Sequence, residues 1–131
     1  MVIQLRALPK PMKVLMVDDN IEHLSLCSEY LPKDEFILDK ALNAAEAMKK
    51  IGENGYDLII LDYSLPDIDG LELLKKIKSR GVNVPIIFTT AFDDPRISFE
   101  AMKNGVEDYV VKTFEYYKTL RERIIDVFRS D

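Results

Sequence analysis

The chain has 131 residues, 47% of them apolar and 31% charged, and its formal net charge is −5. This length and balance fit one domain with its own core, and we expect neither a disordered nor a membrane-spanning chain. The acidic charge argues against direct nucleic acid binding, and one cysteine with one histidine can form neither an internal disulfide nor a zinc site of Cys and His ligands.

Five short apolar runs alternate with longer amphipathic stretches. Four of the runs are continuously apolar, which is typical of parallel strands that are covered on both faces. The run at 36–38 is short and flanked by charged residues, so we expect an edge strand there. In chain order, the expected strands are 14–17, 36–38, 58–61, 85–88 and 109–111.

The amphipathic stretches carry the start and stop signals of helices. Asn43, Asp69 and Asp94 are residues that cap helix N-termini, and glycine or proline follows each of the first four stretches. In the last helix we expect Tyr117 to pack in the core and Tyr116 to face the surface. In chain order, the expected helices are 20–31, Asn43 to Gly52, 71–80, Pro95 to Gly105, and Phe114 toward the C-terminus.

Alternating strands and helices predict an α/β fold in which a five-stranded parallel sheet lies between helices on both faces. The first twelve residues contain Pro9 and Pro11 and show no periodicity. We therefore expect a tail or linker over residues 1–12 and one domain over residues 13–131.

Charged and hydroxyl side chains follow four of the five expected strands. In an open parallel sheet, sites form beyond the carboxyl ends of the strands, so we expect these groups to converge at one edge. The edge strand offers nothing comparable. The residues are Asp18 and Asp19 after the first strand, Asp62 after the third, Thr89 and Thr90 at the fourth, and Lys112 after the fifth.

This set of residues favours phosphoryl chemistry assisted by a metal ion. Three carboxylates at close range repel one another unless a cation joins them, and oxygen ligands select a hard cation such as Mg²⁺. A carboxylate beside Mg²⁺ and a lysine can act as a nucleophile on a phosphoryl group. Lys112 would then neutralise phosphoryl oxygens, and the Thr90 hydroxyl could donate to one of them.

Four motifs at these strand ends resemble the receiver domain of two-component response regulators. Each motif alone is unspecific, but the four occur in order on a fitting βα pattern, and the resemblance covers nearly the whole chain after residue 12. The motifs are Val17-Asp18-Asp19, the stretch from Asp62 to Gly70, Thr90-Ala91, and the stretch from Asp108 to Phe114.

The resemblance implies a flavodoxin-like doubly wound (βα)5 fold and a site that is phosphorylated on Asp62. The phosphoryl group would come from a phospho-histidine donor, either a histidine kinase or a phosphotransfer protein, with Mg²⁺ as cofactor. Asp19 would bind the metal directly and Asp18 through water, while Asp62 and the backbone carbonyl of Ser64 would supply further ligands. Lys112 would assist the transfer.

The resemblance also implies a switch. Thr90 and Tyr109 match the pair that moves on activation, which would shift the face made by the fourth helix, the fifth strand and the fifth helix. An output domain or a second copy of the chain could bind that face.

Because such a domain acts only on itself, we expect a signalling module rather than an enzyme. With a single cysteine, Cys27, a reducing compartment and cytoplasmic localisation are expected.

Several features leave alternatives open. The family usually has proline after the lysine, often with a cis peptide bond before it, whereas this chain has Thr113. Without proline a cis bond costs about 2.5–4 kcal/mol, so we expect a trans bond between Lys112 and Thr113.

We expect His23 to be a solvated helix residue and Cys27 to be buried. The alternative functions are a pseudo-receiver that binds partners without phosphorylation and a small flavodoxin-like enzyme or cofactor binder.

Overall fold

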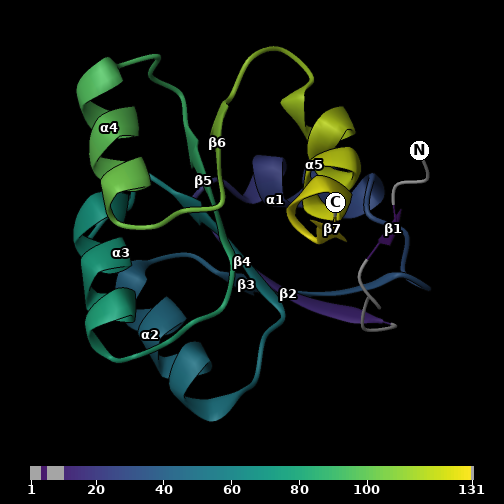
Figure 1. The fold of residues 1–131 in the computed structure, drawn as a ribbon, viewed down its shortest axis with the longest axis horizontal. Helices are drawn as coiled ribbons and strands as arrows, with labels where there is room; N and C mark the ends of the chain where they lie inside the picture. The colour runs from purple at the N-terminus through teal and green to yellow at the C-terminus, as the bar shows by residue number, and fades with distance from the viewer. Residues whose placement is uncertain (1–3, 6–10, 131) are drawn as a thin grey trace.

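The apolar runs form a five-stranded parallel sheet in the order β3-β2-β4-β5-β6 (Figure 1). The computed structural model describes residues 4–5 and 11–130. Every residue of β4 and β5 is buried, as expected for central parallel strands. The strands are β2 (Met12–Val17), β3 (Phe36–Ala41), β4 (Leu58–Asp62), β5 (Ile86–Thr90) and β6 (Asp108–Val111). The predicted flavodoxin-like α/β fold is confirmed.

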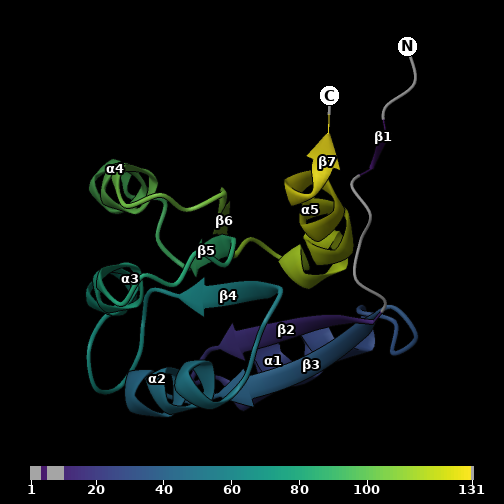
Figure 2. The ribbon, with the colours of Figure 1, turned by 60° about the horizontal axis from the view of Figure 1, so that its bottom comes forward.

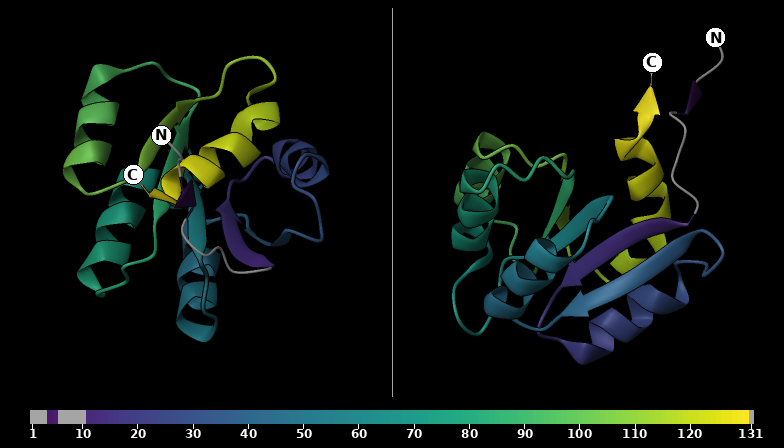
Figure 3. Two further views of the ribbon diagram at one scale, coloured as in Figure 1. Left: turned by 45° about the vertical axis from the view of Figure 1, so that its right-hand side comes forward. Right: turned by 90° about the horizontal axis from the view of Figure 1, so that it is seen from below.

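Five α-helices cover the two faces of the sheet (Figure 2). Helices α2, α3 and α4 pack on one face over one apolar core, and α1 and α5 pack on the other face over a second core (Figure 3). Alternate strand residues enter the two cores because successive side chains of a strand point to opposite faces. The helices are α1 (Ile21–Glu29), α2 (Ala44–Glu53), α3 (Gly70–Ser79), α4 (Pro95–Lys103) and α5 (Leu120–Val127).

The predicted helix caps are present. The side chains of Asn43, Asp69 and Asp94 each accept a hydrogen bond from a backbone N–H in the first turn of α2, α3 and α4. Gly81 and Gly105, with φ of 74° and 84°, follow α3 and α4 in the left-handed conformation that ends a helix. The predicted end of α2 at Gly52 is wrong, since the helix continues to Glu53.

The start of the last helix also differs from the prediction. Glu115 has a φ of 59°, and a 3₁₀ turn, η1 (Tyr116–Thr119), precedes α5. Phe114 therefore lies outside the helix and is 92% exposed. The same turn directs Tyr116 into the core, where it is 6% exposed, so the expectation that it faces the surface is wrong. Tyr117 packs partly buried against that core, in line with the prediction.

The chain ends meet in a second, small sheet. Strands β1 (Gln4–Leu5) and β7 (Arg129–Ser130) pair antiparallel beside α5 (Figure 2). Of the predicted tail over residues 1–12, residues 1–3 and 6–10 lie outside the described residues, and Met12 already belongs to β2. Strand β3 is longer than predicted but holds the expected edge position, next to β2. Among the described residues, no helix is long and apolar enough to cross a membrane.

Candidate functional site

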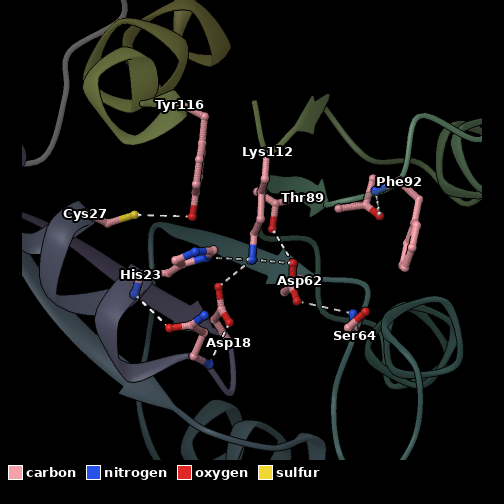
Figure 4. Close-up of polar contacts among 11 residues, drawn as sticks. Asp18, His23, Cys27, Asp62, Ser64, Thr89, Phe92, Lys112 and Tyr116 are labelled. Carbon is pink, nitrogen blue, oxygen red and sulfur yellow. Dashed lines mark hydrogen bonds and ion pairs between the residues drawn. The ribbon is translucent and has the colours of Figure 1, made fainter. Parts of the chain in front are cut away.

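The carboxyl ends of the strands bring the candidate residues together (Figure 4). Asp18 and Asp19 follow β2, Asp62 is the last residue of β4, and Lys112 follows β6. One carboxylate oxygen from each of Asp18, Asp19 and Asp62 lies within 4.8 Å of the others. The sheet thus places three carboxylates and one ammonium group at a single edge.

Lys112 lies between the two buried carboxylates. Its Nζ is 2.7 Å from Asp18 Oδ2 and 2.8 Å from Asp62 Oδ1. Asp18 and Asp62 are 3% and 4% exposed, whereas Asp19 is exposed to solvent. Burial disfavours the charged form of Lys112, but attraction to Asp62 and Asp18 outweighs this effect and raises the pKa of the ammonium group. Lys112 is therefore a stable buried cation.

The positive charge of one ammonium group does not balance the negative charges of this cluster. Burial, together with the charge of Asp18, raises the pKa of the Asp62 carboxyl even though Lys112 pairs with it. Three negative charges face one positive charge, and every candidate ligand is an oxygen atom. A hard divalent cation fits that donor set, and the exposed Asp19 carboxylate lies where such an ion would arrive from solvent.

Both oxygens of Asp62 accept hydrogen bonds. Oδ1, which faces Lys112, also accepts from the hydroxyl of Thr89 at 3.1 Å, and Oδ2 accepts from the backbone N–H of Ser64 at 3.2 Å. Sequence reasoning placed Thr89 at the strand end but gave it no role. The signal that identifies it is the register of the sheet, in which Asp62 pairs directly with Thr89. The role predicted for the Ser64 carbonyl stays a prediction.

Thr90 and Tyr109 both hydrogen-bond to the backbone of one residue, Phe92. The Thr90 hydroxyl accepts a hydrogen bond from the N–H of Phe92 at 3.0 Å, and the Tyr109 hydroxyl donates to the Phe92 carbonyl at 3.2 Å. The ring of Tyr109 stacks on that of Phe88, with a centroid distance of 6.0 Å. Phe92 therefore connects the two residues that the sequence analysis assigned to the switch.

Residues of α1 border the other side of Lys112. His23 Nδ1 lies 3.5 Å from Lys112 Nζ, and its ring contacts the ring of Tyr116 edge-on at 5.9 Å. The expectation that His23 is simply solvated is therefore wrong, because the 3₁₀ turn brings Tyr116 against it. Cys27 is buried as expected, next to the Tyr116 hydroxyl, and burial raises the pKa of its thiol to about 11.

The segment after Lys112 differs from the usual family pattern. The N–H of Thr113 donates to the carbonyl of Val111 at 2.8 Å, a hydrogen bond that proline could not make. Lys112 nevertheless reaches both buried carboxylates. The trans geometry of the Lys112–Thr113 bond stays a prediction.

The loop after Asp62 is fixed at both ends. The N–H of Gly70 donates to the carbonyl of Tyr63 at 2.6 Å, which holds the start of α3 against the end of β4. The carboxylate of Asp67 accepts hydrogen bonds from the N–H groups of Ala44 and Ala45 at 2.9 Å each. The bond from Ala44 is the main cause that lowers the pKa of Asp67. These bonds connect the loop to the N-terminus of α2.

Comparison with known proteins supports the resemblance. The family model of the response regulator receiver domain matches residues 14–125. The transcriptional regulatory proteins TrcR of Mycobacterium tuberculosis and ResD of Bacillus subtilis are 34% and 36% identical over 83% and 78% of this chain. The aligned part is only 42% of each of these relatives, so the chain spans less than half of their length.

Solved structures give the same result. The response regulator TrrA of Thermotoga maritima, in complex with Mg²⁺ and BeF, is 33% identical, with a TM-score of 0.77, and the match covers 88% of this chain and 98% of that one. A CheY-like receiver domain protein of Methanospirillum hungatei is 26% identical, with a TM-score of 0.80, and the match covers 88% of this chain and 91% of that one.

Proposed function

The chain belongs to the response regulator receiver domain family, and we propose that it is a phosphorylation-activated switch of a two-component phosphorelay. Its phosphoryl acceptor is Asp62, and its donor is a phospho-histidine on a histidine kinase or a phosphotransfer protein. The observation that carries the proposal is the buried carboxylate of Asp62 beside Lys112, at an edge where the carboxylates outnumber the cation. The domain acts on its own side chain and turns over no external substrate.

The residues of the site have separate tasks in this transfer. An oxygen of Asp62 attacks phosphorus, the P–N bond to the donor imidazole breaks, and the imidazole keeps the electron pair. As Asp62 loses its negative charge on forming the acyl phosphate, Lys112 is free to pair with the phosphoryl oxygens. Asp18, Asp19, Asp62 and the Ser64 carbonyl would hold Mg²⁺, which neutralises charge on the transferred group when bound.

Phosphorylation should require both Asp62 and a divalent cation. Incubation with phosphoramidate and Mg²⁺ should add one phosphoryl group to the intact protein, as measured by mass spectrometry. Asp62→Asn should abolish the gain because the amide is not a nucleophile, and EDTA should prevent it. Asp34→Asn, a change at an exposed loop residue, should leave it intact. A gain that persists in Asp62→Asn or in EDTA contradicts the assignment, and no gain in the unmodified protein favours the pseudo-receiver alternative.

The switch runs through Phe92. If the Thr90 hydroxyl turns toward the phosphoryl group, it gives up the hydrogen bond from the Phe92 N–H. Phe92 is then free to move, and its carbonyl is the acceptor of the Tyr109 hydroxyl, so Tyr109 loses or shifts its own hydrogen bond. The phosphoryl group thereby makes different contacts in the two states, as a population shift requires. The consequence is a change in the face of α4, β6 and α5, which we propose binds an output domain or a second copy of the chain.

This coupling predicts where the protein responds to beryllofluoride, a mimic of the phosphoryl group. With Mg²⁺ present, amide chemical shifts should change across α4, β6 and α5 as well as near Asp62. Thr90→Val keeps the shape of the side chain but removes the hydroxyl, so shifts near Asp62 should still change while those of the distant face stay in place. Changes confined to the Asp62 loop in the unmodified protein would refute the coupling.

A further inference from the structure

Thr89 is the side chain of β5 that contacts the phosphoryl acceptor. Its hydroxyl donates to Asp62 Oδ1 at 3.1 Å, and both residues are almost fully buried, with 3% and 4% exposure. The contact follows from the sheet itself, because Asp62 and Thr89 are paired in the ladder between β4 and β5. Two rigid central strands therefore hold the hydroxyl on the carboxylate (Figure 4).

We propose that Thr89 is a positioning residue that shortens the lifetime of the phosphoryl group on Asp62 through this hydrogen bond. The inference rests on the proposed function. A hydrogen bond from a hydroxyl is stronger to a charged carboxylate than to the uncharged carboxyl oxygens of an acyl phosphate. The strength of the Thr89 contact thus depends on how much negative charge Asp62 carries at each stage.

Because of that dependence, the Thr89 hydrogen bond affects the rate of phosphorylation differently from the rate of hydrolysis. Phosphoryl transfer passes through a loose transition state, in which the bond to the leaving group is largely broken and the bond to the nucleophile is little formed. During phosphorylation Asp62 is the nucleophile and keeps most of its charge in the transition state. The Thr89 hydrogen bond is then about equally strong before and during the step, so it changes the rate little.

During hydrolysis Asp62 is the leaving group. The oxygen of water forms a bond to phosphorus, the P–O bond to Asp62 breaks, and its electron pair returns to the carboxylate while inorganic phosphate departs and the water proton goes to solvent. Asp62 has regained most of its charge in this transition state, so the Thr89 hydrogen bond is stronger there than in the acyl phosphate. Thr89 therefore accelerates the loss of the phosphoryl group.

The test separates the two rates. The protein is phosphorylated with phosphoramidate and Mg²⁺, the donor is removed by rapid desalting, and the intact mass is followed over time. Thr89→Val, which removes the hydroxyl but keeps the shape, should lengthen the lifetime about three- to tenfold, as expected for one hydrogen bond. Its phosphorylation rate should stay within about twofold of wild type, and Thr89→Ser, which keeps the hydroxyl, should restore the wild-type lifetime.

Three results would overturn the inference. A wild-type lifetime in Thr89→Val excludes the hydrogen bond as a determinant, and Thr89→Ala provides the same test if valine disturbs the core. Equal slowing of phosphorylation and hydrolysis, or failure of Thr89→Ser to restore the lifetime, indicates a merely structural role. If the unmodified protein takes up no phosphoryl group at all, the proposed function fails first, and this is seen in the wild-type sample.

Discussion

Lys112→Met should lower the free energy of unfolding of the metal-free protein by about 3–5 kcal/mol. The Lys112 side chain is 7% exposed, and its ammonium group lies 2.7 Å and 2.8 Å from the carboxylates of Asp18 and Asp62. Methionine keeps an unbranched apolar side chain but removes the only charge that pairs with these two buried anions in the described structure. Denaturant unfolding in EDTA, followed by circular dichroism, measures the loss.

The loss of stability in Lys112→Met should depend on pH because it arises from ionised carboxylates. Burial and the charge of Asp18 already raise the pKa of Asp62 with Lys112 present, and the variant should raise this pKa further. A carboxyl whose pKa is raised by folding contributes stability that is present below its unfolded pKa and lost as pH rises through its folded pKa. The difference between variant and wild type should therefore be smallest near about pH 4 and grow at higher pH.

Mg²⁺ should stabilise both proteins, since the ion binds only where the native fold assembles Asp18, Asp19 and Asp62. At ten times its dissociation constant a ligand adds about 1.4 kcal/mol. Lys118→Met is the matched control, because Lys118 pairs with Glu115 and is 46% exposed. That change should alter stability by less than about 0.5 kcal/mol. Equal losses in the two variants, a loss at Lys112 that does not change with pH, or no stabilisation of the wild-type protein by Mg²⁺ would contradict this account of the site.

Local patterns account for the part of the structure that the sequence predicted. Three of the four continuous apolar runs form the central strands, whereas the run at 109–111 forms the edge strand β6, which is only partly buried. Capping residues such as Asn43, Asp69 and Asp94 define where helices begin, because this signal involves neighbouring residues only. The convergence of Asp18, Asp62 and Lys112 also followed, since it requires only that parallel strands end at one edge.

Contacts that depend on register or on helical phase could not be predicted in this way. Which of two adjacent threonines faces Asp62 depends on the pairing of β4 with β5, which places Thr89 opposite Asp62. Which of two adjacent tyrosines enters the core depends on the left-handed residue Glu115 and the turn after it. A shift of one residue would turn Thr90 in place of Thr89 toward Asp62, and Tyr117 in place of Tyr116 into the core.

Gly70→Ala should destabilise the protein by about 3 kcal/mol, the upper part of the range for overpacking. A Cβ on Gly70 would lie 2.3 Å from the carbonyl oxygen of Asp62 and 2.7 Å from the Cα of Tyr63. Both are main-chain atoms at the end of a buried strand, so no side chain can turn aside to make room. Either α3 moves away, which breaks the 2.6 Å bond from the Gly70 N–H to the Tyr63 carbonyl, or Asp62 itself moves.

A displaced Asp62 should also react more slowly. A misplacement of about 1 Å in a reacting group can cost about a hundredfold in rate, so phosphorylation by phosphoramidate should slow markedly in those Gly70→Ala molecules that stay folded. Gly52→Ala is the matched control, because that glycine lies in α2 with no neighbouring atom within 4 Å of the added Cβ. It should raise the free energy of unfolding by up to about 1 kcal/mol and leave the phosphorylation rate unchanged. If Gly70→Ala instead matched Gly52→Ala in both measurements, the start of α3 could retreat from β4 at no cost, and the position of Asp62 would not depend on the close approach of Gly70.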